Sequence, residues 1–395
     1  MLSESTTVSA AASPVVYERL GVRPLINARG THTRLGGSLL PAEVLDAMRE
    51  AAQAYVVLDE LQDAASRLIE RATGAAAGFV TGGAEAGLLL GAAAAVTQGE
   101  AARIDRLPDL RGMPSEAIMH RAHRNGYDHA VRAAGLSILE VGYGHRTLPE
   151  QLEAAFGDET AIVVYVVAPW VARGALPLAE TCEIAHRHGI PVMVDAAAML
   201  PPAENLRRFL AEGADLVTYS GGKGLRGPQS AGILAGRADL VGWARLNSSP
   251  RHAIGRSAKA AKEDIVGLIV ALERFLALDH EAELAGWRGQ ADHLSAQLAG
   301  LPGVAVRCLY DGDEHPTPDV EAVFAPESGI DAHELVLELE EGDPRIFLFE
   351  SDGPTATPNS LLIHCSSTQP GEERVIASRL RAAIERRLAG PSSAE

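Results

Sequence analysis

A single lysine in a glycine-rich run is the residue best suited to covalent chemistry in this sequence. The run spans residues 219–229 and reads Tyr-Ser-Gly-Gly-Lys-Gly-Leu-Arg-Gly-Pro-Gln, directly after an apolar segment expected to be a strand. The chain has 35 lysines and arginines, yet lysine occurs only at positions 223, 259 and 262. A lysine can lose its proton and attack a carbonyl, whereas an arginine cannot. Lys223 is therefore a candidate Schiff-base nucleophile, and the alternative is a solvated lysine in a turn.

An aspartate upstream of this lysine gives it a chemical partner. Asp195 ends the apolar run Pro-Val-Met-Val-Asp and lies 223 − 195 = 28 residues before Lys223. A carboxylate can keep a pyridine nitrogen protonated while a lysine holds an aldehyde, and pyridoxal phosphate needs both. A P-loop is excluded, because Val217 occupies the position of its first glycine and Gly224 that of its Ser or Thr.

A second glycine-rich turn is suited to the phosphate of such a cofactor. Residues 81–87, Thr-Gly-Gly-Ala-Glu-Ala-Gly, follow a strand-like segment and begin a helix-like one. Backbone N–H groups at the start of a helix attract phosphate. We predict that Gly83 and Ala84 bind it and that the Ser220 hydroxyl assists, with a packing turn as the alternative. Because residue 84 is alanine, the turn does not match the dinucleotide motif G-x-G-x-x-G.

Three further side chains are candidates for the site. His123 follows a strand-like segment and is suited to stack on a pyridine ring or to move protons, with a surface histidine as the alternative. Arg29 and Arg256 are candidates for binding a substrate carboxylate, because a guanidinium offers a fork of donors.

The main candidates share one position in the expected fold. Gly83, His123, Asp195 and Lys223 all lie at, or just beyond, the carboxyl ends of expected strands. Ligands of open α/β sheets bind at that edge. This coincidence of four residues favours a cofactor site over the structural alternatives for each of them.

The composition excludes several classes of protein. A net charge of −17 and the absence of a lysine-rich run argue against a nucleic-acid partner. The cysteines, at positions 182, 308 and 365, are scattered and odd in number, which predicts no metal site, no disulfide framework and a cytoplasmic location. No apolar run is long enough for a membrane span, so no membrane partner is expected.

The alternation of apolar and amphipathic segments predicts an α/β fold. Its central sheet is expected to be mostly parallel with helices on both faces, and a smaller C-terminal α+β domain is expected to follow. The expected strands of the large domain are residues 77–81, 117–121, 137–141, 161–168, 191–195, 215–219 and 232–235, and those of the small domain are 304–309, 320–324, 345–349 and 360–364.

The same patterns divide the chain into five parts. We expect a disordered tail at residues 1–13, an N-terminal segment at 14–72, a large cofactor-binding domain at 73–258, a bridging helix at 259–284 and a small domain at 285–395. Within the N-terminal segment, residues 26–37 are polar and rich in glycine and are expected to form a loop.

These motifs resemble those of the fold-type-I pyridoxal-phosphate enzymes, in particular the group of selenocysteine synthase and D-glucosaminate-6-phosphate ammonia-lyase. The similarity runs from about Tyr17 to Leu388. It rests on the motifs that begin at Ile26, Thr81, His123 and Val194, on the lysine run, and on Gly-Arg-Ser-Ala-Lys-Ala-Ala-Lys-Glu at residues 255–263.

The resemblance implies a role for each candidate. Lys223 would carry the cofactor and Asp195 would pair with its pyridine nitrogen. His123 would stack on the ring, and Gly83, Ala84 and Ser220 would hold the phosphate. It also implies a homodimer or larger homo-oligomer. The sequence departs from related enzymes at His364, where they often place a carboxylate-binding arginine, so the substrate anchor stays open.

The favoured function is a pyridoxal-phosphate-dependent lyase acting on an amino acid. It would eliminate a β-leaving group and release a 2-keto acid and ammonia. The acidic chain suits this activity better than the handling of a seryl-tRNA. Alternatives are an aminotransferase, a racemase, an aldolase or a β-replacement enzyme with the same cofactor, and a non-catalytic binding protein on the same scaffold.

Overall fold

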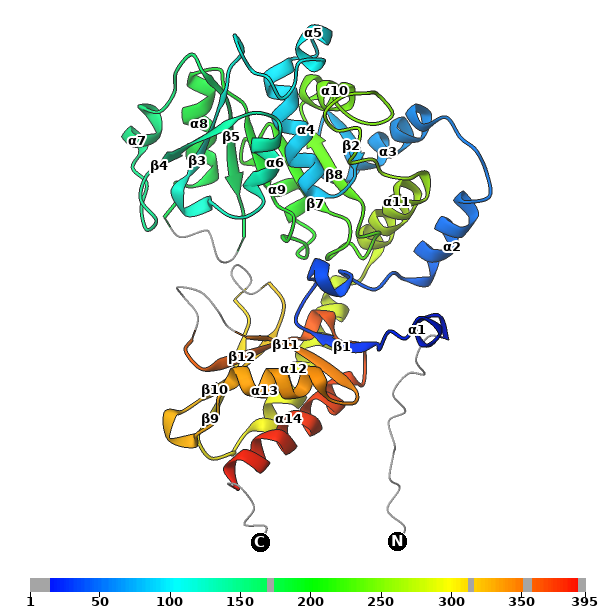
Figure 1. Cartoon of the computed structure of the whole chain (residues 1–395), viewed down its shortest axis with the longest axis vertical. Coiled ribbons are helices and arrows are strands. Elements are labelled where there is room, and N and C mark those ends of the chain that lie inside the picture. The colour runs from blue at the N-terminus through cyan, green and yellow to red at the C-terminus, as the bar shows by residue number, and fades with distance from the viewer. Residues whose placement is uncertain (1–14, 169–173, 312–315, 351–356, 390–395) are drawn as a thin grey trace. The chain divides into compact units, whose positions relative to one another are not determined.

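The computed structural model of the chain describes residues 15–168, 174–311, 316–350 and 357–389 (Figure 1). Contacts between residues group the chain into two compact units. The larger unit is Gly36–Leu278, and the smaller unit combines Met1–Leu35 with Asp279–Glu395. No helix within the described ranges has both the length and the apolar character needed to cross a membrane.

A seven-stranded sheet forms the centre of the larger unit. Its order is β2-β8-β7-β6-β5-β3-β4, and every strand except β8 runs in the same direction. This topology confirms the mostly parallel sheet predicted from the apolar runs. The strands are β2 Ala77–Thr81, β3 Glu116–His120, β4 Ser137–Val141, β5 Thr160–Val166, β6 Val192–Asp195, β7 Leu216–Ser220 and β8 Gly232–Gly236.

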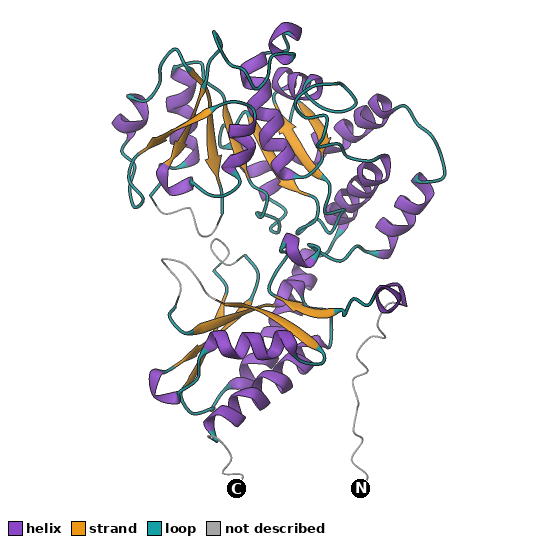
Figure 2. Cartoon of the chain, in the orientation of Figure 1, coloured by secondary structure: helices purple, strands orange, loops and turns teal. Residues whose placement is uncertain are grey.

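Helices cover both faces of this sheet (Figure 2). Because side chains alternate along a strand, Val192 and Val194 enter one apolar cluster while Met193 enters the other. One cluster includes side chains of α3 Leu58–Thr73, α8 Leu178–Arg187, α9 Asn205–Ala211 and α11 Lys262–Ala277, and the other includes those of α4 Ala84–Thr97, α6 Asp128–Ala133 and α10 Ala238–Leu246. This unit also contains α2 Ala42–Ala51, α5 Ala101–Ile104 and α7 Pro149–Glu153.

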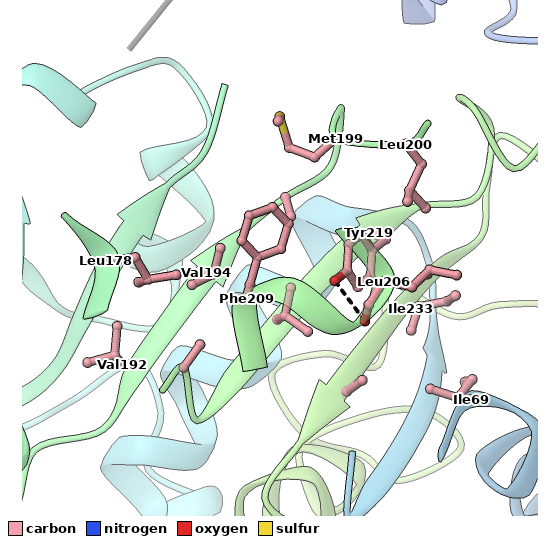
Figure 3. Packing of buried hydrophobic residues seen from close by; sticks show 14 of the residues in the cluster. Ile69, Leu178, Val192, Val194, Met199, Leu200, Leu206, Phe209, Tyr219 and Ile233 are labelled. Atoms are coloured by element: carbon pink, nitrogen blue, oxygen red, sulfur yellow. Dashed lines mark hydrogen bonds between the residues drawn. The ribbon is translucent and has the colours of Figure 1, made fainter. Parts of the chain in front are cut away.

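Tyr219 anchors the end of β7 just before the lysine run. It is 1% exposed, and its hydroxyl donates to the Asn205 carbonyl at 2.7 Å and lies 3.3 Å from the Leu206 carbonyl. Figure 3 shows its ring within the apolar cluster beside α9. The strand end that leads into Lys223 is therefore held by both packing and hydrogen bonds.

The smaller unit contains a five-stranded sheet of order β1-β11-β12-β10-β9. Only β1, which pairs with β11, runs parallel to its neighbour. The strands are β1 Leu25–Ala28, β9 Val304–Leu309, β10 Asp319–Phe324, β11 Arg345–Glu350 and β12 Ser360–His364. Helices α12 His280–Leu298, α13 Ala332–Glu341 and α14 Glu372–Leu388 close the core, and α1 Val15–Leu20 precedes β1.

Two local predictions are wrong. Residues 26–37 were expected to form a loop, but Leu25–Ala28 is a strand because it pairs with β11, more than 300 residues later in the sequence. The bridging helix expected over residues 259–284 is not continuous. Helix α11 ends at Ala277, and α12 begins at His280 with the Asp279 carboxylate accepting from Ala282 N–H.

The contacts therefore divide the chain at Leu35 and at Leu278. The predicted domain boundaries at residues 72, 258 and 284 were drawn from patterns along the sequence, and not from contacts between residues. The predicted tail at residues 1–13 lies outside the described residues.

Candidate active site

Four of the predicted site residues lie at one edge of the seven-stranded sheet. Asp195 is the last residue of β6, and Lys223 lies three residues beyond β7, the neighbouring strand. Gly83 follows β2, and His123 ends a short turn after β3. Since these strands run in the same direction, their carboxyl ends meet at one edge, where α/β proteins bind ligands.

Asp195 and Lys223 are coupled through their charges. Asp195 is 7% exposed, and burial raises the pKa of its carboxyl, although Ala197 N–H donates to Oδ1 at 3.0 Å and Lys223 opposes the rise. Burial also lowers the pKa of Lys223, and the Asp195 charge partly offsets this. Burial thus favours the neutral amine that a nucleophilic lysine requires.

The glycines around Lys223 allow its loop to approach neighbouring backbone closely. A Cβ at Gly224 would lie 2.0 Å from the Leu200 carbonyl oxygen, and one at Gly222 would lie 2.5 Å from Gln229 Cα. The loop after β6 and the lysine run therefore touch through backbone alone. Arg226 N–H closes the turn by donating to the Lys223 carbonyl at 2.9 Å. This close packing positions Lys223 beside the segment that follows Asp195.

The first turn of α4 has the properties of an anion site. Gly83 is the N-cap residue of this helix, with φ +104°, and it has no side chain to accept from the first N–H groups. Ser220 pairs in register with Gly232, and a Cβ on Gly232 would lie 2.5 Å from the Gly83 carbonyl carbon. The three predicted phosphate ligands, Gly83, Ala84 and Ser220, are thus brought to one place. Uncapped N–H groups and a hydroxyl suit a phosphate.

Gly232→Ala is expected to weaken binding of pyridoxal phosphate. The added methyl group would meet the backbone of Gly83 and displace the first turn of α4. We expect the Kd to rise about ten-fold or more, as for the loss of one hydrogen bond to a charged group. Fluorescence titration of the cofactor-free chain measures this. Gly242→Ala, in α10 with nothing within 4 Å of the new Cβ, is the matched control. Equal affinity in the two variants would contradict the assignment.

His123 is buried among aromatic rings. Its Nδ1 accepts from Val166 N–H at 3.2 Å, and its ring meets Tyr165 and His120 edge-on, with centroids 4.4 and 5.1 Å away. Burial and the neighbouring His120 lower the pKa of His123 to about 3. Its Nε2 has no hydrogen-bond partner among the described residues. The imidazole is therefore neutral with one unused donor or acceptor.

The two predicted substrate arginines belong to different units. Arg256 is exposed on a loop of the larger unit, and this loop reaches the phosphate turn, since a Cβ at Gly82 would lie 2.5 Å from the Ala258 oxygen. Arg29 belongs to the smaller unit, where its Nη1 lies 3.4 Å from Glu340 Oε1. The structure therefore joins Arg256, but not Arg29, to the unit that carries Lys223.

Three residues of this region were not predicted from the sequence. The Glu85 charge contributes to raising the pKa of Asp195, and His120 and Tyr165 enclose His123. Glu85 follows the predicted phosphate ligands directly, so its place at a helix start was a usable signal. Tyr165 lies within an otherwise apolar strand, where the sequence gives no reason to separate it from the core.

The pH at which Lys223 becomes reactive is expected to be lower than for an ordinary lysine. Attachment of pyridoxal phosphate to the cofactor-free chain, followed by absorbance, should reach half its maximal rate below pH 10.5. Asp195→Asn should lower this midpoint further, because it removes the charge that stabilises the protonated amine. An unchanged midpoint in Asp195→Asn would show that the two groups are not coupled.

These features define a class of protein. One edge of the mostly parallel sheet carries a half-buried amine coupled to a buried carboxylate, a helix start with a glycine cap and a neutral imidazole. A fold-type-I pyridoxal-phosphate enzyme requires such a set of groups. The residues fit the cofactor: the open helix start suits its phosphate, and the buried Asp195 carboxylate suits a protonated pyridine nitrogen.

Comparison with known proteins identifies the family. Residues 122–285 match the family model described as SelA: L-seryl-tRNA selenium transferase. D-glucosaminate-6-phosphate ammonia lyase of Salmonella typhimurium is 33% identical over 341 residues, covering 85% of this chain and 89% of that protein. A 5'-C-glycyluridine monooxygenase-decarboxylase of a Streptomyces species is 34% identical over 340 residues, covering 84% and 83%.

Solved structures agree with this result. A D-glucosaminate-6-phosphate ammonia-lyase superposes with a TM-score of 0.81 at 30% identity, covering 95% of this chain and 99% of that one. SPT with a bound PLP internal aldimine has the same fold, with a TM-score of 0.59 at 15% identity, covering 92% and 88%. The chain belongs to the pyridoxal-phosphate-dependent enzyme family that includes selenocysteine synthase and D-glucosaminate-6-phosphate ammonia-lyase. The predicted cofactor and the lyase class are confirmed at this level.

Proposed function

We propose that this enzyme removes a β-hydroxyl group from an amino acid and releases a 2-keto acid and ammonia. The observation that carries the proposal is the coupled pair of Lys223 and Asp195 at the sheet edge, in a chain related to an ammonia-lyase. The reaction balances without an oxidant. The hydroxyl leaves as one water molecule, and one water molecule is consumed when the nitrogen is released as ammonia.

The residues of the site have separate roles in this reaction. Bound pyridoxal phosphate supplies an electron sink for the charge that forms at the substrate Cα. Burial lowers the pKa of Lys223, whose Nζ would hold the cofactor and, once displaced by the substrate amine, would take the α-proton. Asp195 would keep the pyridine nitrogen protonated. Gly83, Ala84 and Ser220 would hold the phosphate.

A substrate with several anionic groups suits the available arginines. Arg256 is the nearer candidate by position, since its loop adjoins the phosphate turn of the same unit. Arg29 and His364 are further candidates within the smaller unit, where a Cβ on Gly30 would lie 3.5 Å from the His364 ring. The related ammonia-lyase is named for D-glucosaminate 6-phosphate, so phosphorylated hydroxy-amino acids are the first substrates to test.

The test is ammonia release from a panel of D- and L-hydroxy-amino acids, with and without a phosphate group. The holoenzyme is expected to form equal amounts of ammonia and 2-keto acid without any added keto-acid acceptor. A strict requirement for an acceptor would replace the lyase with an aminotransferase. Oxygen consumption together with CO2 release would instead favour the chemistry named for the Streptomyces relative.

We further propose a homodimer or larger homo-oligomer that acts on small molecules in the cytoplasm. Helix α1 buries no residue in the single chain, and its Val15, Tyr17 and Leu20 are 77%, 47% and 63% exposed, as expected of a surface covered by another subunit. Light scattering should give a multiple of 41.5 kDa.

The proposed cytoplasmic location and the small-molecule substrate rest on composition. The three cysteines are free, which suits a reducing compartment. The net charge of −17 disfavours a nucleic-acid partner.

A further inference from the structure

The hydrogen bonds around His120 define its tautomer. Thr147 uses its only hydroxyl proton to donate to the Gly174 carbonyl at 2.8 Å. It can therefore only accept from His120, whose Nδ1 lies 3.3 Å away, so Nδ1 carries the proton. His120 Nε2 lies 3.2 Å from the Thr181 hydroxyl and accepts from it. His120 is fully buried and neutral, with both ring nitrogens satisfied within the chain.

His123 has the opposite tautomer. A backbone N–H can only donate, so the contact from Val166 to His123 Nδ1 makes Nδ1 the acceptor. In a neutral ring the proton then belongs to Nε2. This N–H is buried and has no acceptor among the described residues. A buried donor without a partner destabilises the folded chain, and nearly all buried polar groups in proteins have a partner, so this N–H calls for an explanation.

We infer that His123 is a fixed hydrogen-bond donor that presents Nε2–H to an anionic oxygen of the bound ligand. This inference rests on the proposed function and deepens it. The acceptor is either the phenolate oxygen of the cofactor or the carboxylate of the amino acid, which share the required chemistry. Because Val166 occupies Nδ1 and the ring is enclosed by His120 and Tyr165, His123 neither takes up nor shuttles protons.

Selective ¹⁵N labelling of histidine in the full chain tests the tautomer directly. Long-range ¹H–¹⁵N correlation should show His123 with an unprotonated Nδ1 and a protonated Nε2, and His120 with the reverse. The signals are assigned by their loss in His123→Gln and His120→Gln. An imidazolium, or a protonated Nδ1 in His123, would overturn the inference whether or not the enzyme is a lyase.

Adding ligands separates the two acceptors. Pyridoxal phosphate alone should move the Nε2 proton of His123 downfield if the acceptor is the phenolate. If the acceptor is the carboxylate, that shift should occur only when D- or L-alanine is also present, since alanine has a carboxylate but no β-leaving group. No shift in either case would overturn the inference. Absence of ammonia release from any amino acid would reject only the proposed lyase activity.

Substitutions give a second readout. The amide nitrogen of glutamine reaches about as far as Nε2, whereas that of asparagine reaches only Nδ1, and phenylalanine keeps a ring without an N–H. We expect His123→Phe and His123→Asn to weaken ligand binding about ten- to hundred-fold, and His123→Gln to restore most of it. Full binding by His123→Phe, with its fold checked by thermal melting, would mean that the ring acts by stacking alone.

Discussion

Lys223→Ala is expected to abolish both turnover and the absorbance of lysine-bound cofactor. The methyl group cannot form the covalent bond or accept the α-proton, so the rate should fall by at least about 10³-fold. Pyridoxal phosphate should still bind non-covalently, because the first turn of α4 is unchanged. Visible absorbance of the purified protein and ammonia release measure the two effects.

Because the chain has only three lysines, control substitutions can separate the role of Lys223 from that of the other two. Lys223→Arg keeps a positive charge but cannot attack a carbonyl, so it should behave like the alanine variant. Lys259→Ala removes an exposed amine and should retain turnover and colour. Borohydride reduction of the wild-type holoenzyme, followed by peptide mapping, must choose among only three lysines. Label on Lys259 or Lys262, or full activity in Lys223→Ala, would reject the assignment.

Asp195→Asn is expected to reduce turnover by about 10² to 10³-fold, the range found when one preorganised electrostatic group is removed. Asparagine cannot hold a proton on the pyridine nitrogen, so the electron sink weakens while the shape of the site is retained. Covalent attachment at Lys223 should persist, which separates this variant from Lys223→Ala by absorbance. Asp195→Glu restores the charge and should recover part of the rate. Turnover within two-fold of the wild type in Asp195→Asn would contradict the role.

Asp195→Asn should also stabilise the cofactor-free chain. Burial raises the pKa of Asp195 above its unfolded value, so the folded state binds this proton more tightly. Such a group favours folding at acid pH, and this stability is lost as the pH rises through the folded pKa. At neutral pH, the cofactor-free Asp195→Asn variant should therefore be more stable than the cofactor-free wild type, by a free energy of unfolding on the order of 1 kcal/mol. Its Tm should be higher accordingly. The gain should shrink toward acid pH, and a lower Tm at neutral pH would show that the carboxylate is not destabilising.

Local patterns in the sequence predicted many elements closely. The bounds expected for β2, β4, β9 and β12 agree with the structure residue for residue. Turn chemistry explains other element ends: α3 ends at Thr73, and the following Gly74 adopts φ +75°, a conformation that glycine reaches without strain. Errors arose where distant segments pair. The residues of β1 have the local pattern of a loop, and they form a strand because they pair with β11. The apolar residues of β8 do not indicate that it runs antiparallel to β7.

By itself, the sequence determined that Lys223, Asp195, His123 and the Gly83 turn follow strands of one parallel sheet, because strand polarity places their ends at a common edge. Only the tertiary structure decided their protonation. Burial favours the neutral form of Lys223, and Val166 N–H leaves the proton of His123 on Nε2. Burial and hydrogen-bond partners come from residues far apart in the chain, so no local pattern of residue types encodes them.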